Sequence, residues 1–197
     1  MIGAMGSPVA HRVQMREALE LEAQAQHLVL EGASEEARDA FLAAAERYRA
    51  SWELASPTSY GRLVGMLKAA ILAGHGDGEA SYVREQLASA PTGSATAAYA
   101  LAICALLAAD DEAAERHART MREGAEPFLR AADAITALAR RDDARYTRAL
   151  RAIVDDFAAR PEHLTGVAIA DTALMMERLA ARRGMSAQLS SPLLPPL

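Results

Sequence analysis

The sequence has few of the residues that carry disulfide, metal or strand-forming roles. Cys104 is the only cysteine, which excludes an internal disulfide and a cysteine-ligated metal cluster. Aromatic residues make up 5% of the chain, and runs of Val, Ile and Thr are few, so strands are not expected. The longest apolar run, 95–109, is alanine-rich and interrupted by Thr96. It is too short and too weakly apolar to span a bilayer, and we expect a buried helix there.

Excess positive charge and a targeting segment are also missing. The formal net charge is −5, which disfavours nucleic-acid binding as the main activity because phosphate contacts need a basic surface. Only Lys68 is a lysine among the 21 basic residues. No basic segment followed by an apolar run opens the chain, so we expect no signal peptide and a cytoplasmic protein.

Motifs of catalysis and cofactor binding are absent as well. No two of the five histidines are three or four residues apart, so no helix presents a pair of histidine ligands. The chain has no phosphate-binding glycine loop after a strand and no G-x-S-x-G nucleophile turn. The glycine-rich segment 74–78 follows a predicted helix and is typical of a helix–helix turn. We therefore expect no metal, no cofactor and no enzyme activity.

Strong helix formers are what the chain has in abundance. It is 51% hydrophobic, and its commonest residues, Ala, Leu, Arg and Glu, favour helices. We predict an all-α protein of about nine helices within one helical-repeat domain at 8–184. Residues 1–7 contain a segment that resembles a cloning scar and are predicted to be disordered. The Pro- and Leu-rich tail 185–197 is predicted to pack on the last helices, because its leucines are too apolar for a solvated end.

Local signals predict where several helices begin and end. Ser34 is expected to cap the second helix, and Pro127 is expected at the first position of the seventh. The last helix is expected to span 164–183, with Gly184 just beyond its end. The segment 95–109 has no polar face, so we expect it to be the central and most buried helix.

Three stretches share a pattern that repeats about every 33 residues. Each has an aspartate anchor, a leucine five residues before it and a large apolar residue ten after it. The matching positions are Leu72–Asp77–Leu87, Leu106–Asp111–Met121 and Leu138–Asp143–Ile153. This period predicts helix–turn–helix units that bury their apolar faces by stacking on one another. Since each aspartate separates two predicted helices, we expect it to cap the second one.

Arginines and tyrosines supply the candidate partner-binding residues. A basic stripe follows one predicted helix and the turn before it, at Arg140, Arg141, Arg145, Arg148 and Arg151. Nearby aspartates favour a solvated, locally paired face, while a docking patch for an acidic partner is the alternative. From this stripe we select Arg141, Arg145 and Arg148. Tyr60 and Tyr99 are added because they lie on helices expected to line the inner face of the array.

Two family resemblances add to this interpretation. The 34-residue step and paired helices of 60–160 resemble the tetratricopeptide superfamily, although only leucine and small-residue positions match. That resemblance implies antiparallel helix pairs stacked in a right-handed array.

The C-terminal half resembles a bacterial polymorphic-toxin immunity family, number forty-nine. The matching parts are Asp-x-x-Arg-Tyr at 142–146, the small-residue-rich segment 166–184 and the extended tail at 191–195. The second resemblance implies an intracellular binder that neutralises a cognate toxin, and it supplies no catalytic residues.

These observations predict a non-catalytic cytoplasmic module that binds another protein, either a toxin or a peptide. Neither nucleic acid nor a membrane is expected as a partner, and homo-oligomers remain open. The alternative is a tetratricopeptide-like adaptor or regulator that binds a peptide or a partner subunit. A small-molecule binder or enzyme ranks third.

Overall fold

The computed structural model describes residues 9–89 and 93–196, and across these ranges the chain forms nine α-helices and no strands. The all-α prediction is therefore confirmed, while residues 1–7 lie outside the described part. The helices are α1 (Ala10–Glu31), α2 (Ser34–Leu54), α3 (Gly61–Leu72), α4 (Asp77–Gln86), α5 (Ala95–Leu107), α6 (Asp111–Met121), α7 (Glu126–Ala139), α8 (Asp143–Ala158) and α9 (Asp171–Ala181).

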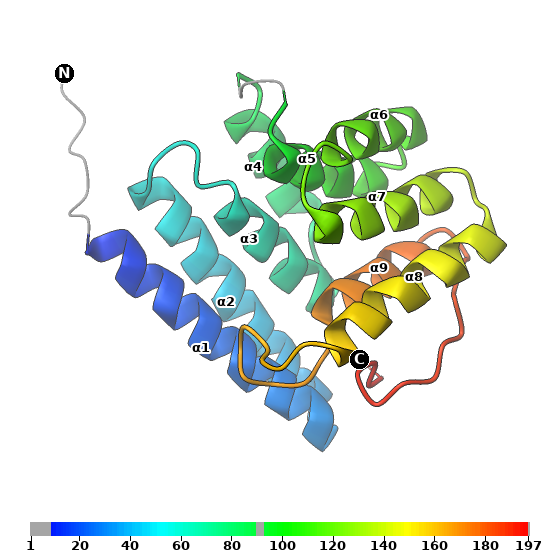
Figure 1. Cartoon of the computed structure of the whole chain (residues 1–197). Helices are drawn as coiled ribbons and strands as arrows, with labels where there is room; N and C mark the ends of the chain where they lie inside the picture. The colour runs from blue at the N-terminus through cyan, green and yellow to red at the C-terminus, as the bar shows by residue number, and fades with distance from the viewer. Residues whose placement is uncertain (1–8, 90–92, 197) are drawn as a thin grey trace.

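Helices that follow one another along the chain pack side by side. The closest pairs are α1 with α2, α5 with α6, and α7 with α8. Short turns join the members of each pair, so the two helices run in opposite directions. Figure 1 shows the long α1–α2 pair at one end of the molecule and the α7–α8 pair toward the other.

The helices α3, α5 and α7 end in the same way. Each is followed, two residues after its last helical residue, by a residue in the left-handed conformation: Gly74 at φ 86°, Ala109 at φ 55° and Arg141 at φ 54°. The next residue then donates its N–H to a carbonyl in the last helical turn, at 2.9–3.0 Å. This arrangement satisfies carbonyls that the helix end would otherwise leave free, and it reverses the chain.

The expected aspartate caps are wrong by one residue. Asp77, Asp111 and Asp143 are the first residues of α4, α6 and α8, and the caps are Gly76, Asp110 and Asp142. The carboxylates of Asp110 and Asp142 each accept a hydrogen bond, at 3.0 Å, from the backbone N–H three residues later. The turns before α6 and α8 each contain two adjacent aspartates, and the sequence alone does not indicate which of the two caps the helix.

Other predicted boundaries shift for similar local reasons. Ala33 occupies the cap of α2, so Ser34 is the first helical residue and its side chain caps nothing. Pro127 is the second residue of α7, because Glu126 opens that helix. Both positions belong to the first turn, where a proline costs no hydrogen bond.

The last helix begins later than predicted. It starts at Asp171 rather than near residue 164, because 159–170 form turns and Gly166 takes φ 75°. It ends at Ala181, two residues before the predicted end at 183. Gly184 then follows in the left-handed conformation at φ 69°, and the next N–H donates to the carbonyl of Ala180 at 3.0 Å. The prediction failed at the start because small apolar residues alone do not distinguish a helix from a buried loop.

Helix α9 packs against α3, α8 and α7, and it runs in the same direction as α3, α5 and α7. Near its start, Thr172 shares a pocket with residues from the first turns of all three helices. At its far end, Arg182 pairs with Asp77 at 2.8 Å and Arg183 pairs with Asp111 at 3.1 Å. These two aspartates follow the ends of α3 and α5, so α9 is held at both of its ends.

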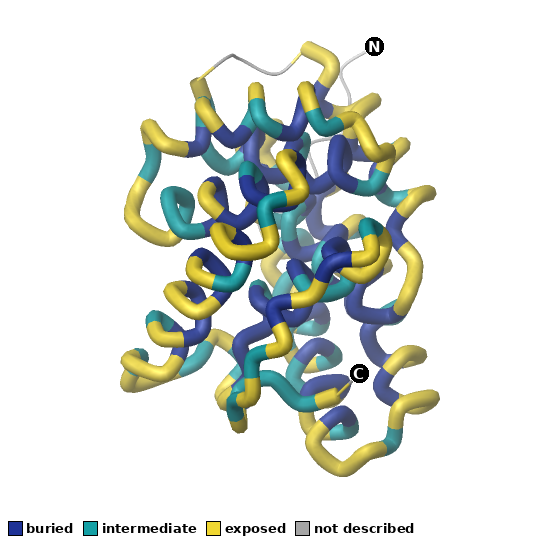
Figure 2. Tube along the Cα trace, turned by 90° about the vertical axis from the view of Figure 1, so that its right-hand side faces the viewer, coloured by how far each residue is buried: buried dark blue, intermediate teal, exposed yellow. Residues whose placement is uncertain are grey.

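The core is continuous through the molecule. Figure 2 shows buried residues along the inward sides of the helices and exposed residues at the peripheral turns. Leu106 of α5 is 1% exposed. In the tail, Met185 and Ala187 are buried, and the Leu193 carbonyl accepts a hydrogen bond from the Ala170 N–H at 2.9 Å. No helix in the described ranges has the length and apolar character needed to cross a membrane.

Candidate functional site

A groove rich in arginine lies over α6, α7 and α8. Its volume is about 510 Å³. The groove is open because the side chains at its base are small, mainly Thr136, Ala137, Ala149 and Ala152. The charged residues around it are Glu115, Arg119, Arg122, Asp133, Arg140, Arg145 and Arg148. We call this surface the arginine groove. Alanines on the facing sides of α7 and α8 thus produce a concave surface with charged walls.

Positive charge dominates the arginine groove, with five guanidinium groups against two lining carboxylates. Arg122 pairs with Asp133 at 2.6 Å, and Arg140 pairs with Glu115 at 2.7 Å. Arg148 forms no ion pair or side-chain hydrogen bond within the described residues. The groove therefore offers guanidinium groups that the protein itself does not neutralise.

The ion pairs of the groove are exposed and can exchange partners. The Arg140 hydrogen bond lowers the pKa of Glu115, with the charges of Arg140 and Arg119 adding to the effect. The same hydrogen bond raises the pKa of Arg140, so both groups stay charged at neutral pH. The Arg122 and Asp133 side chains are 43% and 56% exposed. Exposed pairs of this kind contribute about 0–1 kcal/mol each, so a partner's carboxylates can replace them at little cost.

Two of the five predicted binding residues lie in the groove, and a third lies outside it. Arg145 and Arg148 share the face of α8 that lines the groove. Arg145 also pairs with Asp142 at 3.2 Å. Arg141 does not line the groove. Its Nη1 donates to the carbonyl of Arg183 at 3.3 Å, so this side chain contacts the end of α9.

The two predicted tyrosines lie elsewhere and are buried. Tyr60 is 8% exposed and packs against Trp52, with ring centroids 6.0 Å apart. Tyr99 is 9% exposed and meets Phe128 edge to face at 6.1 Å. Burial raises the pKa of Tyr99, so its hydroxyl is neutral. Tyr99 also lines a second, smaller pocket of about 280 Å³ between α3, α5, α7, α8 and α9.

Sequence reasoning missed Arg119 and Arg122, which complete the groove from the side of α6. Their spacing of three residues, shared with Arg116, places them near one another on a helix. That signal was present in the sequence. The spacing alone does not predict the groove, because the groove forms only where α6, α7 and α8 pack together.

A buried ionic centre lies apart from the groove and consists of Glu22, Tyr48, Lys68 and Asp171. The Lys68 Nζ lies 2.8 Å from Glu22 Oε1 and 2.5 Å from Asp171 Oδ2, and the Tyr48 hydroxyl donates to Glu22 Oε2 at 2.5 Å. Burial alone would lower the pKa of Lys68, but the two carboxylates together raise it well above its usual value. Lys68 is therefore an ammonium group at neutral pH. It ties α1, α3 and α9 together and is unsuited to act as a nucleophile.

Among the described residues, no group of three or more His, Cys, Asp and Glu side chains is arranged to hold a metal ion. Comparisons of the chain with protein-family models, with curated proteins and with solved structures found no match. The arginine groove is thus the surface whose geometry most directly supports a function.

Proposed function

We propose that this protein is a non-catalytic module that binds another protein, and that an acidic segment of the partner docks in the arginine groove. The observation that carries the proposal is the set of five guanidinium groups around one concave surface with two carboxylates between them. Arginine suits this task because its planar fork pairs with a carboxylate through two parallel hydrogen bonds.

A protein partner fits the charge distribution better than a nucleic acid does. The whole chain carries a formal charge of −5, so the groove is a local basic surface on an acidic molecule. The exposed faces of α1 and α2 carry many of the acids, including Glu20, Glu31, Glu35, Glu36, Asp39 and Glu46. A long polyanion would meet that repulsion, whereas a short acidic segment of a protein reaches the groove alone.

The architecture that we propose for this module is a tetratricopeptide-like, right-handed array built from the helix pairs of α3 to α8. Two observations support it. The aspartate anchors recur at steps of 34 and 32 residues in the sequence. In addition, α3, α5 and α7 end in the same left-handed turn. Such arrays present extended surfaces between their units, which is where the arginine groove lies.

We further propose that the partner is a cognate bacterial toxin and that the protein is an intracellular immunity protein. The support is the resemblance of 142–146, 166–184 and 191–195 to immunity family forty-nine. Arg145, the arginine of the first of these segments, lines the groove. An adaptor that binds an acidic peptide of a partner subunit would use the same groove. Identifying the bound partner distinguishes the adaptor from the immunity protein.

Fluorescence anisotropy with a labelled, glutamate-rich twelve-residue peptide tests the groove directly. The wild-type protein should bind the peptide, and binding should weaken as salt rises because the interface is charged. The Arg145→Glu/Arg148→Glu variant should lose at least about tenfold in affinity, since each removed charge-assisted hydrogen bond contributes about 1.5–3 kcal/mol.

A matched control reverses the same number of charges elsewhere. Arg12 and Arg16 are exposed on α1, and Arg12→Glu/Arg16→Glu should leave peptide affinity within about twofold, because the change lies outside the groove. Equal losses in both double variants would mean that net charge, not the groove, determines binding, and the proposal would fail. The same pair of variants then serves to test a toxin from the native host.

A further inference from the structure

The second pocket, which Tyr99 lines, is apolar inside and charged at one side. We call it the Tyr99 pocket. It encloses about 280 Å³, and its apolar walls include Val64, Phe128, Ile153 and Phe157. This volume lies below the roughly 300–1,000 Å³ typical of sites for drug-sized ligands. The pocket therefore suits a small molecule, and it is too small for a nucleotide.

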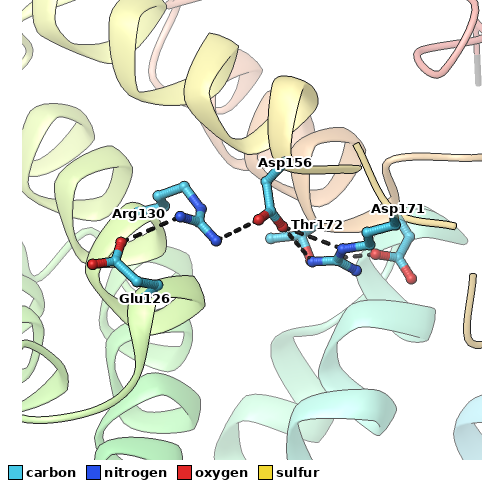
Figure 3. Close-up of polar contacts among 6 residues, drawn as sticks. Glu126, Arg130, Asp156, Asp171 and Thr172 are labelled. Carbon is cyan, nitrogen blue, oxygen red and sulfur yellow. Dashed lines mark hydrogen bonds and ion pairs between the residues drawn. The ribbon is translucent and has the colours of Figure 1, made fainter. Parts of the chain in front are cut away.

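Two guanidinium groups share a single carboxylate at the charged side of the pocket. Arg130 pairs with Asp156 Oδ1 at 2.5 Å, and Arg160 pairs with Asp156 Oδ2 at 2.6 Å. Figure 3 shows Arg130 between the carboxylates of Glu126 and Asp156. Glu126 is 75% exposed and 3.3 Å from Arg130, so an incoming carboxylate can replace it on Arg130 at little cost. Arg130, Asp156 and Arg160 are only 23–35% exposed. These three groups keep one positive charge in excess, which the exposed Glu126 balances from the solvent side.

The first turns of four helices contribute to the same pocket. They supply Gly61 of α3, Thr96 of α5, Pro127 of α7 and Thr172 of α9. No side chain caps α3, α7 or α9. Helix N-termini carry partial positive charge, so they add to the potential that the guanidinium groups set up. Asp171, the acid in the first turn of α9, is already paired with Lys68 at 2.5 Å.

We infer that the Tyr99 pocket binds a small organic monocarboxylate with a compact apolar body, such as an arylacetate. The apolar body fills the space between Val64, Phe128 and Ile153, and the carboxylate meets Arg130 and Arg160. A cation would be repelled by the two guanidinium groups, and a neutral molecule cannot replace the charge of Glu126 on Arg130. This site goes beyond the proposed partner binding and uses none of the residues of the arginine groove.

Isothermal titration calorimetry with phenylacetate tests the inference on the full chain. Phenylacetate should bind saturably with one site per protein. Acetate lacks the apolar body, phenylacetamide lacks the charge and phenethylamine has the opposite charge. Each should bind at least about tenfold more weakly, because a charge-assisted hydrogen bond or a buried ring each contributes more than 1.4 kcal/mol. Equal affinity for phenylacetate and phenylacetamide would overturn the inference.

Two variants locate the site, and a third is the control. Arg160→Gln should weaken phenylacetate binding about tenfold or more, and Val64→Phe should abolish it by filling the pocket while leaving every charge in place. Arg122→Gln removes an arginine of the arginine groove whose side chain is 43% exposed, against 35% for Arg160, and should leave phenylacetate affinity unchanged. Circular dichroism melts establish that each variant is folded.

Two further outcomes overturn the inference, namely no saturable binding by the wild-type protein and unchanged binding by folded Val64→Phe. The Arg145→Glu/Arg148→Glu protein should bind phenylacetate normally. For that reason, failure here leaves the proposed partner binding standing, and failure of peptide binding leaves this site standing.

Discussion

Replacing Lys68 by methionine removes the only cation from the buried ionic centre and keeps most of the side-chain volume. Glu22 is 0% exposed and the Asp171 side chain 13% exposed, so the variant leaves two carboxylates in the core without a counter-ion. Removing one partner of a buried ion pair costs about 3–5 kcal/mol. Domains are stable by about 5–15 kcal/mol in total. For a chain of this size we expect the melting temperature to fall by roughly 6–20 °C.

The dependence on pH gives this prediction a second, independent readout. In the wild-type protein the pKa of Lys68 is raised above its usual 10.5. A cation with a raised pKa contributes stability that is fully present below its unfolded value and is lost as pH rises through the folded value. The contribution of the Lys68 charge to wild-type stability should therefore be constant near neutral pH and be lost in strong alkali.

The Lys68→Met variant should behave differently in acid. Burial without a counter-ion disfavours the charged form of a carboxylate, so protonation relieves the penalty. The difference in melting temperature between variant and wild type should shrink as pH falls from 7 toward about 4.5. Differential scanning calorimetry at both pH values measures it.

A neutral replacement of the whole centre is the matching test. Lys68→Met combined with Glu22→Gln and Asp171→Asn removes all three charges and should recover much of the lost stability, because no buried charge is left unpaired. Arg122→Met, which breaks an exposed pair, should cost under about 1 kcal/mol. A Lys68→Met protein that melts within 2 °C of wild type would refute the reasoning.

Urea unfolding tests four further changes. Leu106→Ala, in a side chain 1% exposed, should lower the free energy of unfolding by about 2–5 kcal/mol. Gly65→Ala puts a methyl group 2.7 Å from the Tyr48 ring, which its bond to Glu22 holds in place, and should cost about 1–3 kcal/mol. Ala109→Gly relieves the strain of a left-handed backbone at φ 55° and should raise the free energy of unfolding by up to about 1 kcal/mol. A lower free energy of unfolding would contradict this prediction. Asp142→Ala removes a helix cap and should cost about 1 kcal/mol.

The helical fold could be predicted because its causes are local. Alanine-rich composition, turn residues and the apolar stretch of α5 each act within a few residues, and they placed the starts of α2, α4, α6, α7 and α8 to within one residue. The exceptions arise where two local choices are equivalent or where packing decides. Asp110 and Asp111 are both good caps, and 164–170 stays outside α9 although its residues are small and apolar.

The candidate site could be predicted only in part, for a physical reason. Arg145 and Arg148 were found because helical spacing puts them on one face of α8. Arg119 and Arg122 join them only through the packing of α6 on α7. The ionic centre was missed entirely, since Lys68 and Asp171 are 103 residues apart. No local pattern marks a lysine that will be buried rather than solvated.

The position of α9 has a consequence for how the chain reaches its native state during synthesis. The ribosome releases α3 and α7 well before α9, which packs against both. Until α9 emerges, Lys68 lacks Asp171 as a partner, and the faces of α3 and α7 that α9 covers stay open to solvent. Contacts between residues this distant in sequence form slowly, and exposed apolar surface in incomplete chains favours aggregation. Docking of α9 therefore covers these faces and gives Lys68 its second carboxylate.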